Sequence, residues 1–369
     1  MRPIALVESV DESAYGGKAA QLAAAIRAGL PVPGGVALSF GFVDAVSAGH
    51  PTAIRELAEV CATLDGPVAV RSSAVGEDSE TASFAGQHLT CLNVRPSPPA
   101  LTDAVGAIWK SAYSGSALAY RQRLRLPSEP RIGVVVQELV VADCAGVLFT
   151  RNPFDGADEI VIEANWGLGE SVVAGLVTPD HFRLSREGRV LERTPGTKDI
   201  EVRVLPEGGT REAEVPAELV RALCLGDKQL RELHALAMRC EKAFGGAQDL
   251  EWAFAGGTLY LLQRRAVTSA MKKGTRGSVK VVSRRPSLSR GLSPISIIRL
   301  IYGKNKEPTS GLEPLTCSLP VIIHVLQGFA RACKSRISKP VSFPRLAQCC
   351  TVLRSRWCQS GVNITLVSA

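Results

Sequence analysis

The composition of the chain changes abruptly near Met271, and this break limits what can fold as one body. Residues 1–270 carry 26 Lys and Arg against 33 Asp and Glu, a net charge of −7, whereas residues 271–369 carry 17 against 2, a net charge of +15. The last 99 residues hold 14 Ser and 4 Ala, while the earlier part is rich in alanine throughout. We therefore expect a folded domain over 1–270 and a separate basic, Cys- and Ser-rich tail over 271–369.

The basic tail shows no pattern of a known module. Its five cysteines include no Cys-x-x-Cys pair and no histidine at zinc-finger spacing, so we expect no zinc site. Nucleic-acid binding is the functional alternative for such a tail, but the stretch has only four aromatic residues and no recognisable motif, so we do not expect it. A switch to Arg, Ser and Cys is typical of translation past a lost stop codon or in a shifted frame. We predict that the tail is disordered or poorly packed.

The overall composition is that of a globular protein with a real core. Of the 369 residues, 46% are hydrophobic and 21% are charged. The N-terminus has no apolar run typical of a secretory signal, and the apolar stretch "LPVIIHVL" is too short to cross a bilayer. We expect a cytoplasmic protein without a membrane partner or a disulfide framework. The five cysteines of the body lie among apolar neighbours and are expected to be small buried residues.

Helical and strand patterns alternate along the body without a regular repeat. Helices are expected at 16–30 after a glycine turn, at 101–125 and, as a pair, at 216–244. Continuous apolar runs at 132–140 and 145–150 suit buried strands, and the body closes with two strands over 249–265. This mixture favours an α+β fold over a doubly wound sheet.

The closing hairpin places several polar side chains on one face. A turn at 256–258, centred on residue 257, puts Glu251 opposite Gln263, and the period of two puts Asp249 and Arg265 on the same face as that pair. Carboxylate and amide oxygens suit Mg²⁺, which usually shares them with substrate phosphates. The alternative is an ordinary solvated sheet face.

Six motifs in order along the chain resemble one family. They are "GGKAAQL", "VRSSAVGEDSETASFAGQ", "VVVQELV", "AGVLFTRNP", "NWGLGESVVAGLVTPD" and "DLEWAFAGGTLYLLQRR". Together they cover roughly residues 10–268 and resemble the nucleotide-binding domain of the phosphoenolpyruvate synthase and pyruvate phosphate dikinase family, which rifampicin phosphotransferases share. The resemblance implies an ATP-grasp fold, in which two subdomains enclose ATP and Mg²⁺.

The resemblance assigns the polar loop at 70–87 and the first glycine turn to the ATP phosphates. Arg71 matches the family's phosphate-binding arginine, whose planar fork suits phosphate oxygens. Ser83, Ala85 and Gly86 are small enough to let backbone amides approach an anion. Lys18 matches a phosphate-contacting lysine, although "GGKAAQL" is not a Walker A loop. Without the other motifs, Lys18 would be taken for a surface lysine and the loop for an ordinary solvated one.

The remaining implied contacts come from two strand segments. Gln137, Glu138 and Val140 match the family's adenine-facing strand, for which an ordinary buried strand is the alternative. Glu251 and Gln263 match its metal ligands, and Arg265 matches its second phosphate-binding arginine. The proline that commonly follows this arginine is replaced by Ala266. The "NWGLGE" loop, with Glu163 just before it, matches a segment near the nucleotide and is assigned no specific contact.

The family's complete enzymes contain more than an ATP domain. ATP phosphorylates a histidine in a "TSHAA"-like motif, and a mobile domain carries the phosphoryl group to pyruvate or an antibiotic. None of the five histidines here has that context. The resemblance therefore implies the ATP half of a phosphotransferase of the pyruvate, water dikinase type (ATP, pyruvate and water giving phosphoenolpyruvate, AMP and phosphate), with a separate phosphohistidine carrier as partner. The alternatives are the ATP domain of a rifampicin phosphotransferase and a non-catalytic ATP-binding remnant.

Overall fold

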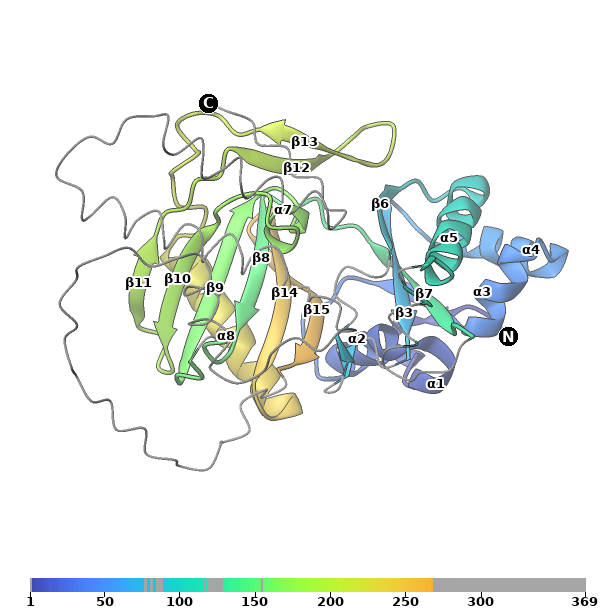
Figure 1. Cartoon of the computed structure of the whole chain (residues 1–369), viewed down its shortest axis with the longest axis horizontal. Coiled ribbons are helices and arrows are strands. Elements are labelled where there is room, and N and C mark those ends of the chain that lie inside the picture. Colours follow the sequence, from blue (N-terminus) through green and yellow to red (C-terminus); the bar gives the residue numbers. More distant parts are fainter. Residues whose placement is uncertain are drawn as a thin grey trace, which may run out of the picture. The chain divides into compact units, whose positions relative to one another are not determined.

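The computed structural model describes residues 2–75, 78–79, 82–83, 89–115, 117–118, 122, 129–153 and 155–267, with only the backbone of 78–79 and 82–83. All of them belong to one compact unit, Met1–Ser278 (Figure 1). The predicted tail, Ala85, Gly86 and the side chain of Ser83 lie outside the described residues. Helices and two large open sheets are mixed along the chain, so the predicted α+β class is confirmed.

The first sheet is antiparallel throughout and carries helices on both faces. Its strands, in spatial order, are β1 (Ile4–Ala5), β2 (Gly35–Leu38), β7 (Ile132–Glu138), β3 (Val68–Ala74) and β6 (Thr90–Val94). Helices α3 (Phe40–Ser47), α4 (Pro51–Cys61) and α5 (Pro98–Ala112) cover one face, where Leu57, Leu101 and Ile108 pack against Val70, Val134 and Val136. On the other face, Leu22 of helix α2 (Gly17–Arg27) packs against Val135.

The N-terminus of α2 sits unusually close to strand β3. A short 3-10 helix η1 (Leu6–Glu8) and helix α1 (Glu12–Tyr15) lead to Gly16, whose φ is 84°. A Cβ at Gly16 would lie 2.0 Å from the carbonyl oxygen of Ser73, so only glycine fits there. The Ser73 hydroxyl accepts a hydrogen bond of 3.0 Å from the backbone N–H of Ala19. This contact fixes the first turn of α2, including Lys18, against β3.

The second sheet is also antiparallel and is covered on one face by a single long helix. Its strands, in spatial order, are β11 (Val190–Thr194), β10 (Asp180–Ser185), β9 (Glu159–Trp166), β8 (Cys144–Phe149), β14 (Gln248–Ala255) and β15 (Thr258–Ala266). Helix α8 (Asp227–Phe244) packs against Leu250, Trp252 and Phe254. Because side chains alternate along β14, Asp249 and Glu251 lie on the opposite face.

Two small elements accompany that opposite face. Helix α7 (Glu170–Val173) and the hairpin β12 (Ile200–Val204) to β13 (Thr210–Glu214) both contact it. An apolar cluster there is formed by Ala142, Ala145, Leu168, Val202 and Ala253, with Leu92, Val140, Val204 and Leu262 packed around it. A two-stranded ribbon, β4 (Asp78–Ser79) with β5 (Ala82–Ser83), lies in the loop after β3.

The structure corrects one of the predicted helices. Over the predicted range 101–125, α5 ends at Ala112 and, after a turn at 113–114, the described residues 115, 117–118 and 122 are helical again. The first half of the pair predicted over 216–244 is instead made of turns before α8 begins at Asp227. The Leu219 carbonyl accepts a hydrogen bond from the Trp166 indole, and the Val220 carbonyl accepts one from the backbone N–H of Lys198. Long-range partners thus satisfy backbone groups that a helix would have used.

The body cysteines behave largely as predicted. Cys61, Cys144, Cys224 and Cys240 are buried and Cys91 is half-buried, and all five are free thiols. Burial raises the pKa of the Cys240 thiol to about 11. Among the described helices, none combines the length and the apolar character needed to cross a membrane.

One fully buried ion pair holds the far side of the second sheet. The Asp180 carboxylate accepts hydrogen bonds from the Lys198 ammonium and from the backbone N–H of Gly196 and Cys224, and both charged side chains are 0% exposed. Lys198 also donates to the Val220 carbonyl. The pair therefore joins β10 to the segment before β12 and to the turns before α8.

We expect Asp180→Asn to lower the free energy of unfolding by about 3–5 kcal/mol, because it leaves the Lys198 ammonium buried without its counter-charge. Urea unfolding followed by circular dichroism measures this. Lys228→Met is the control, since Lys228 pairs with Glu232 on an exposed face of α8 and should cost less than about 1 kcal/mol. A similar small loss in both variants would contradict a structural role for the buried pair.

Candidate functional site

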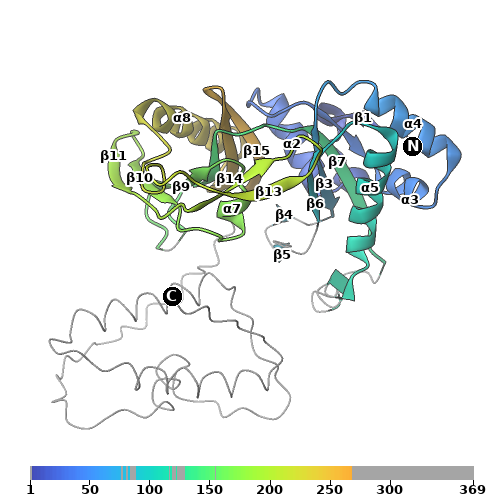
Figure 2. The same ribbon diagram turned by 90° about the horizontal axis from the view of Figure 1, so that it is seen from above.

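The predicted site residues come from both sheets. Arg71 lies in β3 and Lys18 in α2, on the first sheet, whereas Glu251 lies in β14, and Gln263 and Arg265 lie in β15 of the second sheet. Helix α2 contacts both β3 and β15, and Figures 1 and 2 show it beside β15. The two groups of residues therefore meet where the sheets approach each other.

Arg71 connects the two sheets directly. Its Nη1 donates a hydrogen bond of 3.0 Å to the carbonyl oxygen of Leu262 in β15, and its Nη2 lies 3.7 Å from Oε2 of Glu251. The Arg71 side chain is 12% exposed and that of Glu251 is 24% exposed. An arginine so placed has one edge of its guanidinium committed to the second sheet and remains next to a carboxylate predicted to bind a metal.

Lys18 is buried rather than on the surface. It is 7% exposed, and its Nζ donates a hydrogen bond of 3.0 Å to the carbonyl oxygen of Ser72, the neighbour of Arg71. The alternative of a plain surface lysine is therefore wrong. The close approach of Gly16 to Ser73 brings this ammonium group to β3.

The hairpin pairs its polar residues as predicted, but by a different turn. Glu251 lies opposite Gln263 and Asp249 opposite Arg265. The expected turn was centred on residue 257, whereas the structure has a two-residue turn at Gly256 and Gly257, with φ of 55° and 78°. Positive φ at both positions is the geometry of a type I′ turn. An irregularity between Glu251 and Trp252 shifts the register by one residue and restores the predicted pairs.

Arg265 is held by an acidic partner on the neighbouring strand. Its Nε lies 2.5 Å from Oδ2 of Asp249, a residue that is 8% exposed. Burial raises the pKa of the Asp249 carboxyl, and the positive charge of Arg265 opposes that rise. Each arginine of the site thus has a carboxylate beside it.

Glu170, which the sequence did not single out, interacts electrostatically with Arg71 of this site. It begins α7 inside the "NWGLGE" motif and accepts a hydrogen bond of 3.5 Å from the Thr210 hydroxyl of β13. Burial raises the pKa of its carboxyl, and the hydrogen bond from Thr210 and the charge of Arg71 act in the opposite direction. The only sequence signal for Glu170 was its place in that motif. Glu163, just before the motif, lies 3.8 Å from the His181 ring.

The three residues expected to face adenine lie on or just after β7. Gln137 is buried, and its amide donates a hydrogen bond of 3.2 Å to the Pro33 carbonyl. Glu138 is exposed and lies beside Gly34. A Cβ added to Gly34 would lie 2.9 Å from the Glu138 carboxylate. Val140 packs against the apolar cluster on the open face of the second sheet. Of the three, Val140 offers an apolar surface next to the site.

The oxygen donors fit a magnesium ion shared with a ligand. Glu251 and Gln263 provide a carboxylate and an amide oxygen from directly opposed positions on two strands. Over the ranges that the structure describes, no group of three or more His, Cys, Asp or Glu side chains could hold a metal by itself. A hard cation that binds through one or two protein oxygens and substrate phosphates is the kind that this pair suits.

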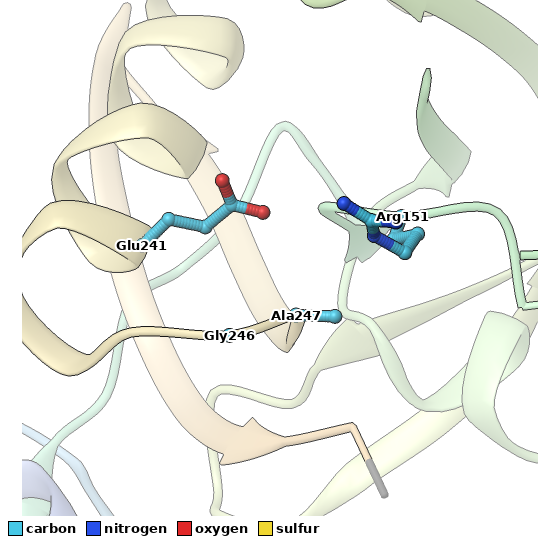
Figure 3. A pocket seen from close by; sticks show the side chains of 4 residues that line it. All are labelled: Arg151, Glu241, Gly246 and Ala247. Atoms are coloured by element: carbon cyan, nitrogen blue, oxygen red, sulfur yellow. The ribbon is translucent and has the colours of Figure 1, made fainter. Parts of the chain in front are cut away.

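A pocket elsewhere on the molecule lacks all of the predicted site residues. It lies at the connection between α8 and β14 and is lined by Arg151, Glu241, Gly246 and Ala247 (Figure 3). The Glu241 carboxylate pairs with Arg186, and Arg151 lies 3.2 Å from Asp158. The charged groups at this pocket therefore already have partners within the protein.

Known proteins share this domain. Residues 38–285 match the family described as pyruvate phosphate dikinase, AMP/ATP-binding domain. A probable phosphoenolpyruvate synthase of Methanothermobacter thermautotrophicus is 40% identical over 248 residues, which cover 65% of this chain and 36% of that protein. A rifampicin phosphotransferase of Streptomyces sviceus is 40% identical over 203 residues, which cover 54% of this chain and 23% of that protein.

A third relative, a probable phosphoenolpyruvate synthase of Methanocaldococcus jannaschii, is 37% identical over 225 residues, covering 60% of this chain and 19% of that protein. The chain thus spans between about a fifth and about a third of the length of these relatives. The family model covers well over half of the chain, and the resemblance found in the motifs is confirmed. The chain belongs to the pyruvate phosphate dikinase AMP/ATP-binding domain family.

Proposed function

We propose that this chain is a Mg²⁺-dependent, ATP-binding phosphotransferase subunit with an ATP-grasp fold, its two subdomains built around the two large sheets. The observation that carries the proposal is the contact of Arg71, from the first sheet, with Leu262 and Glu251 of the second. Lys18 is held against Ser72, the neighbour of Arg71, and Gln263 lies opposite Glu251. Family membership independently supports binding of ATP. A cytoplasmic location accompanies the proposal, because ATP is its substrate.

The side chains suit phosphate chemistry. Arg71 and Arg265 offer planar donors for phosphate oxygens, and Lys18 adds a third positive charge. Ser83 and Gly86 are proposed to bring backbone amides to the phosphates, and Gln137, Glu138 and Val140 to line the adenine side. Glu251 and Gln263 would hold Mg²⁺, which supplies charge stabilisation to the phosphates when bound. Phosphoryl transfer depends mainly on such positioning and charge stabilisation.

The pairing of charges within the protein suggests how binding proceeds. Arg71 lies beside Glu251 and Arg265 beside Asp249, so both cations are partly neutralised before a nucleotide arrives. A triphosphate would replace Glu251 as the partner of Arg71, and Glu251 would then be free to hold a cation. Nucleotide and metal would therefore bind most favourably together.

The phosphoryl acceptor is proposed to come from outside the domain. Among the described histidines, His50 is the exposed N-cap residue of α4, His181 lies beside Glu163 and His234 contacts the Arg186 carbonyl, and none of these contacts is with Lys18, Arg71 or Arg265. His88 and His324 lie outside the described residues. We propose a phosphohistidine carrier, as a separate protein or domain, which passes the group to pyruvate in a reaction of the pyruvate, water dikinase type.

Two other functions share these residues. The similarity to a rifampicin phosphotransferase favours an antibiotic as the final acceptor, reached through the same kind of carrier. The other is a remnant that keeps the fold without turnover. Both acceptors share the same ATP site, and a remnant differs from an active subunit in lacking turnover of bound ATP with a carrier.

Mg·ATP at about a hundred times its dissociation constant should stabilise the wild-type protein by about 2.7 kcal/mol. Arg71→Met should lose this stabilisation, because it removes the donor shared by the two sheets and the triphosphate. Thermal unfolding of each variant with and without ligand measures the difference. Arg231→Met, on the exposed side of α8, is the matched control and should respond like the wild type. No response in the wild type would contradict the proposed ATP-binding function.

Glu251→Gln should show how much of the ATP affinity depends on the metal. The amide keeps the shape but loses the charge, so ATP affinity in the presence of Mg²⁺ should fall about tenfold or more. In EDTA the variant should bind ATP at least as well as the wild type, since a carboxylate next to the phosphates is gone. Calorimetric titration under both conditions measures this, with the surface variant Glu232→Gln as control. Equal affinity of the variant and the wild type in Mg²⁺ would exclude Glu251 as a metal ligand.

A further inference from the structure

One residue of the first sheet, Asn93, is hydrogen-bonded to the tip of the β12–β13 hairpin. The side-chain amide of Asn93, in β6, donates hydrogen bonds of 2.7 Å to the carbonyl oxygens of both Leu205 and Gly209. Its own carbonyl oxygen accepts a hydrogen bond of 3.0 Å from the backbone N–H of Gly209. Three hydrogen bonds therefore connect a single side chain and its backbone to a turn more than a hundred residues away.

The backbone of Asn93 has an uncommon conformation. Its φ is 55°, the one positive φ outside glycine in the part of the chain that the structure describes, and the residue is 5% exposed. Asparagine tolerates the left-handed region better than most residues, but a conformation of this kind persists only when its surroundings determine it. Here the surroundings are a β-bulge in the pairing of β6 with β3, where the register shifts between Val68 and Val70, together with the carbonyls of the hairpin.

Neighbouring contacts strengthen the same connection. Arg95 donates a hydrogen bond of 2.6 Å to the Pro206 carbonyl, and Leu92 packs in the apolar cluster with Val204 and Leu262. At its other end the hairpin starts from the second sheet, where the backbone N–H of Leu168 donates to the Val202 carbonyl at 2.9 Å. Figure 1 shows the hairpin extending from above β8 and β9 toward β6.

We propose that the β12–β13 hairpin is a strap that holds the two sheets in the geometry needed for nucleotide binding, and that Asn93 is the positioning residue that fastens it. This inference rests on the proposed function. The strap sets the spacing between Arg71 on the first sheet and Glu251 with Gln263 on the second. It never touches the nucleotide itself and acts by placing the residues that do.

Two short paths lead from the strap to the site. On the first sheet, β6 pairs with β3 so that Thr90 lies opposite Arg71, three residues before Asn93. From the hairpin, Thr210 donates to Glu170, whose carboxylate interacts with the charge of Arg71. Release of the hairpin tip would move the edge strand next to Arg71 and would free Glu170 to compete with phosphate for that arginine.

The test uses two variants of Asn93 in the full chain. Asn93→Gly removes the two side-chain donors while relieving the positive φ, whereas Asn93→Asp keeps the shape and places a carboxylate against two carbonyls. Glu207→Gln, an exposed position in the same turn, is the matched control. For each protein we would measure the dissociation constant for Mg·ATP by calorimetry and the urea unfolding midpoint, together with hydrogen exchange of residues 200–214.

If the hairpin is a strap, the loss of affinity for Mg·ATP should not parallel the loss of stability against urea. Both Asn93 variants should bind Mg·ATP about tenfold more weakly and exchange faster over 200–214, although the unfolding midpoint of Asn93→Gly stays closer to the wild type than that of Asn93→Asp. Glu207→Gln should match the wild type throughout. Lower midpoints with unchanged affinity would mean a purely structural contact and overturn the strap alone. A wild type that fails to bind Mg·ATP would overturn the proposed function and the strap with it.

Discussion

The candidate site depends on the guanidinium of Arg71, which lies on one sheet and binds the other. Arg71 is carried by a buried strand of the first sheet, yet its hydrogen bond goes to the Leu262 carbonyl on the last strand of the second. A charge-assisted hydrogen bond with little exposure is among the stronger polar contacts in a protein, on the order of 1.5–3 kcal/mol. This contact fixes where the first sheet meets Glu251.

The charges at this junction are arranged as mutual partners. Arg71 has Glu251 and Glu170 near it, Arg265 has Asp249, and Lys18 has a backbone carbonyl. Three cations without partners would repel one another and oppose close approach of the sheets. The acids remove that repulsion in the free protein. In the proposed complex, the charge of a metal held by Glu251 would offset the loss of that carboxylate as the partner of Arg71.

The sequence predicts those parts of the fold and of the candidate site that depend on interactions between residues close together in the chain. The pairing of Glu251 with Gln263 follows from the period of two and from two adjacent glycines, all within seventeen residues, and it is confirmed. The turn itself was predicted wrongly. The predicted turn differs from the observed one by one residue, and the one-residue register shift between Glu251 and Trp252 compensates for that difference. The helix expected after residue 216 failed because Trp166 and Lys198, distant in sequence, take its carbonyls. Periodicity carries no information about such partners.

Asn93 shows the same limit from the other direction. In the sequence it is one polar residue in a short strand, where a left-handed φ is neither favoured nor signalled. Its conformation follows from the β-bulge in the pairing of β6 with β3 and from the hairpin tip that it binds. The first strand of that hairpin, β12, in turn forms a bridge from Val202 to Gly167 of the "NWGLGE" motif. The family motifs mark the groups proposed to meet a nucleotide. The contacts that hold those groups at the right separation lie between motifs, where strain and buried hydrogen bonds are the evidence for them.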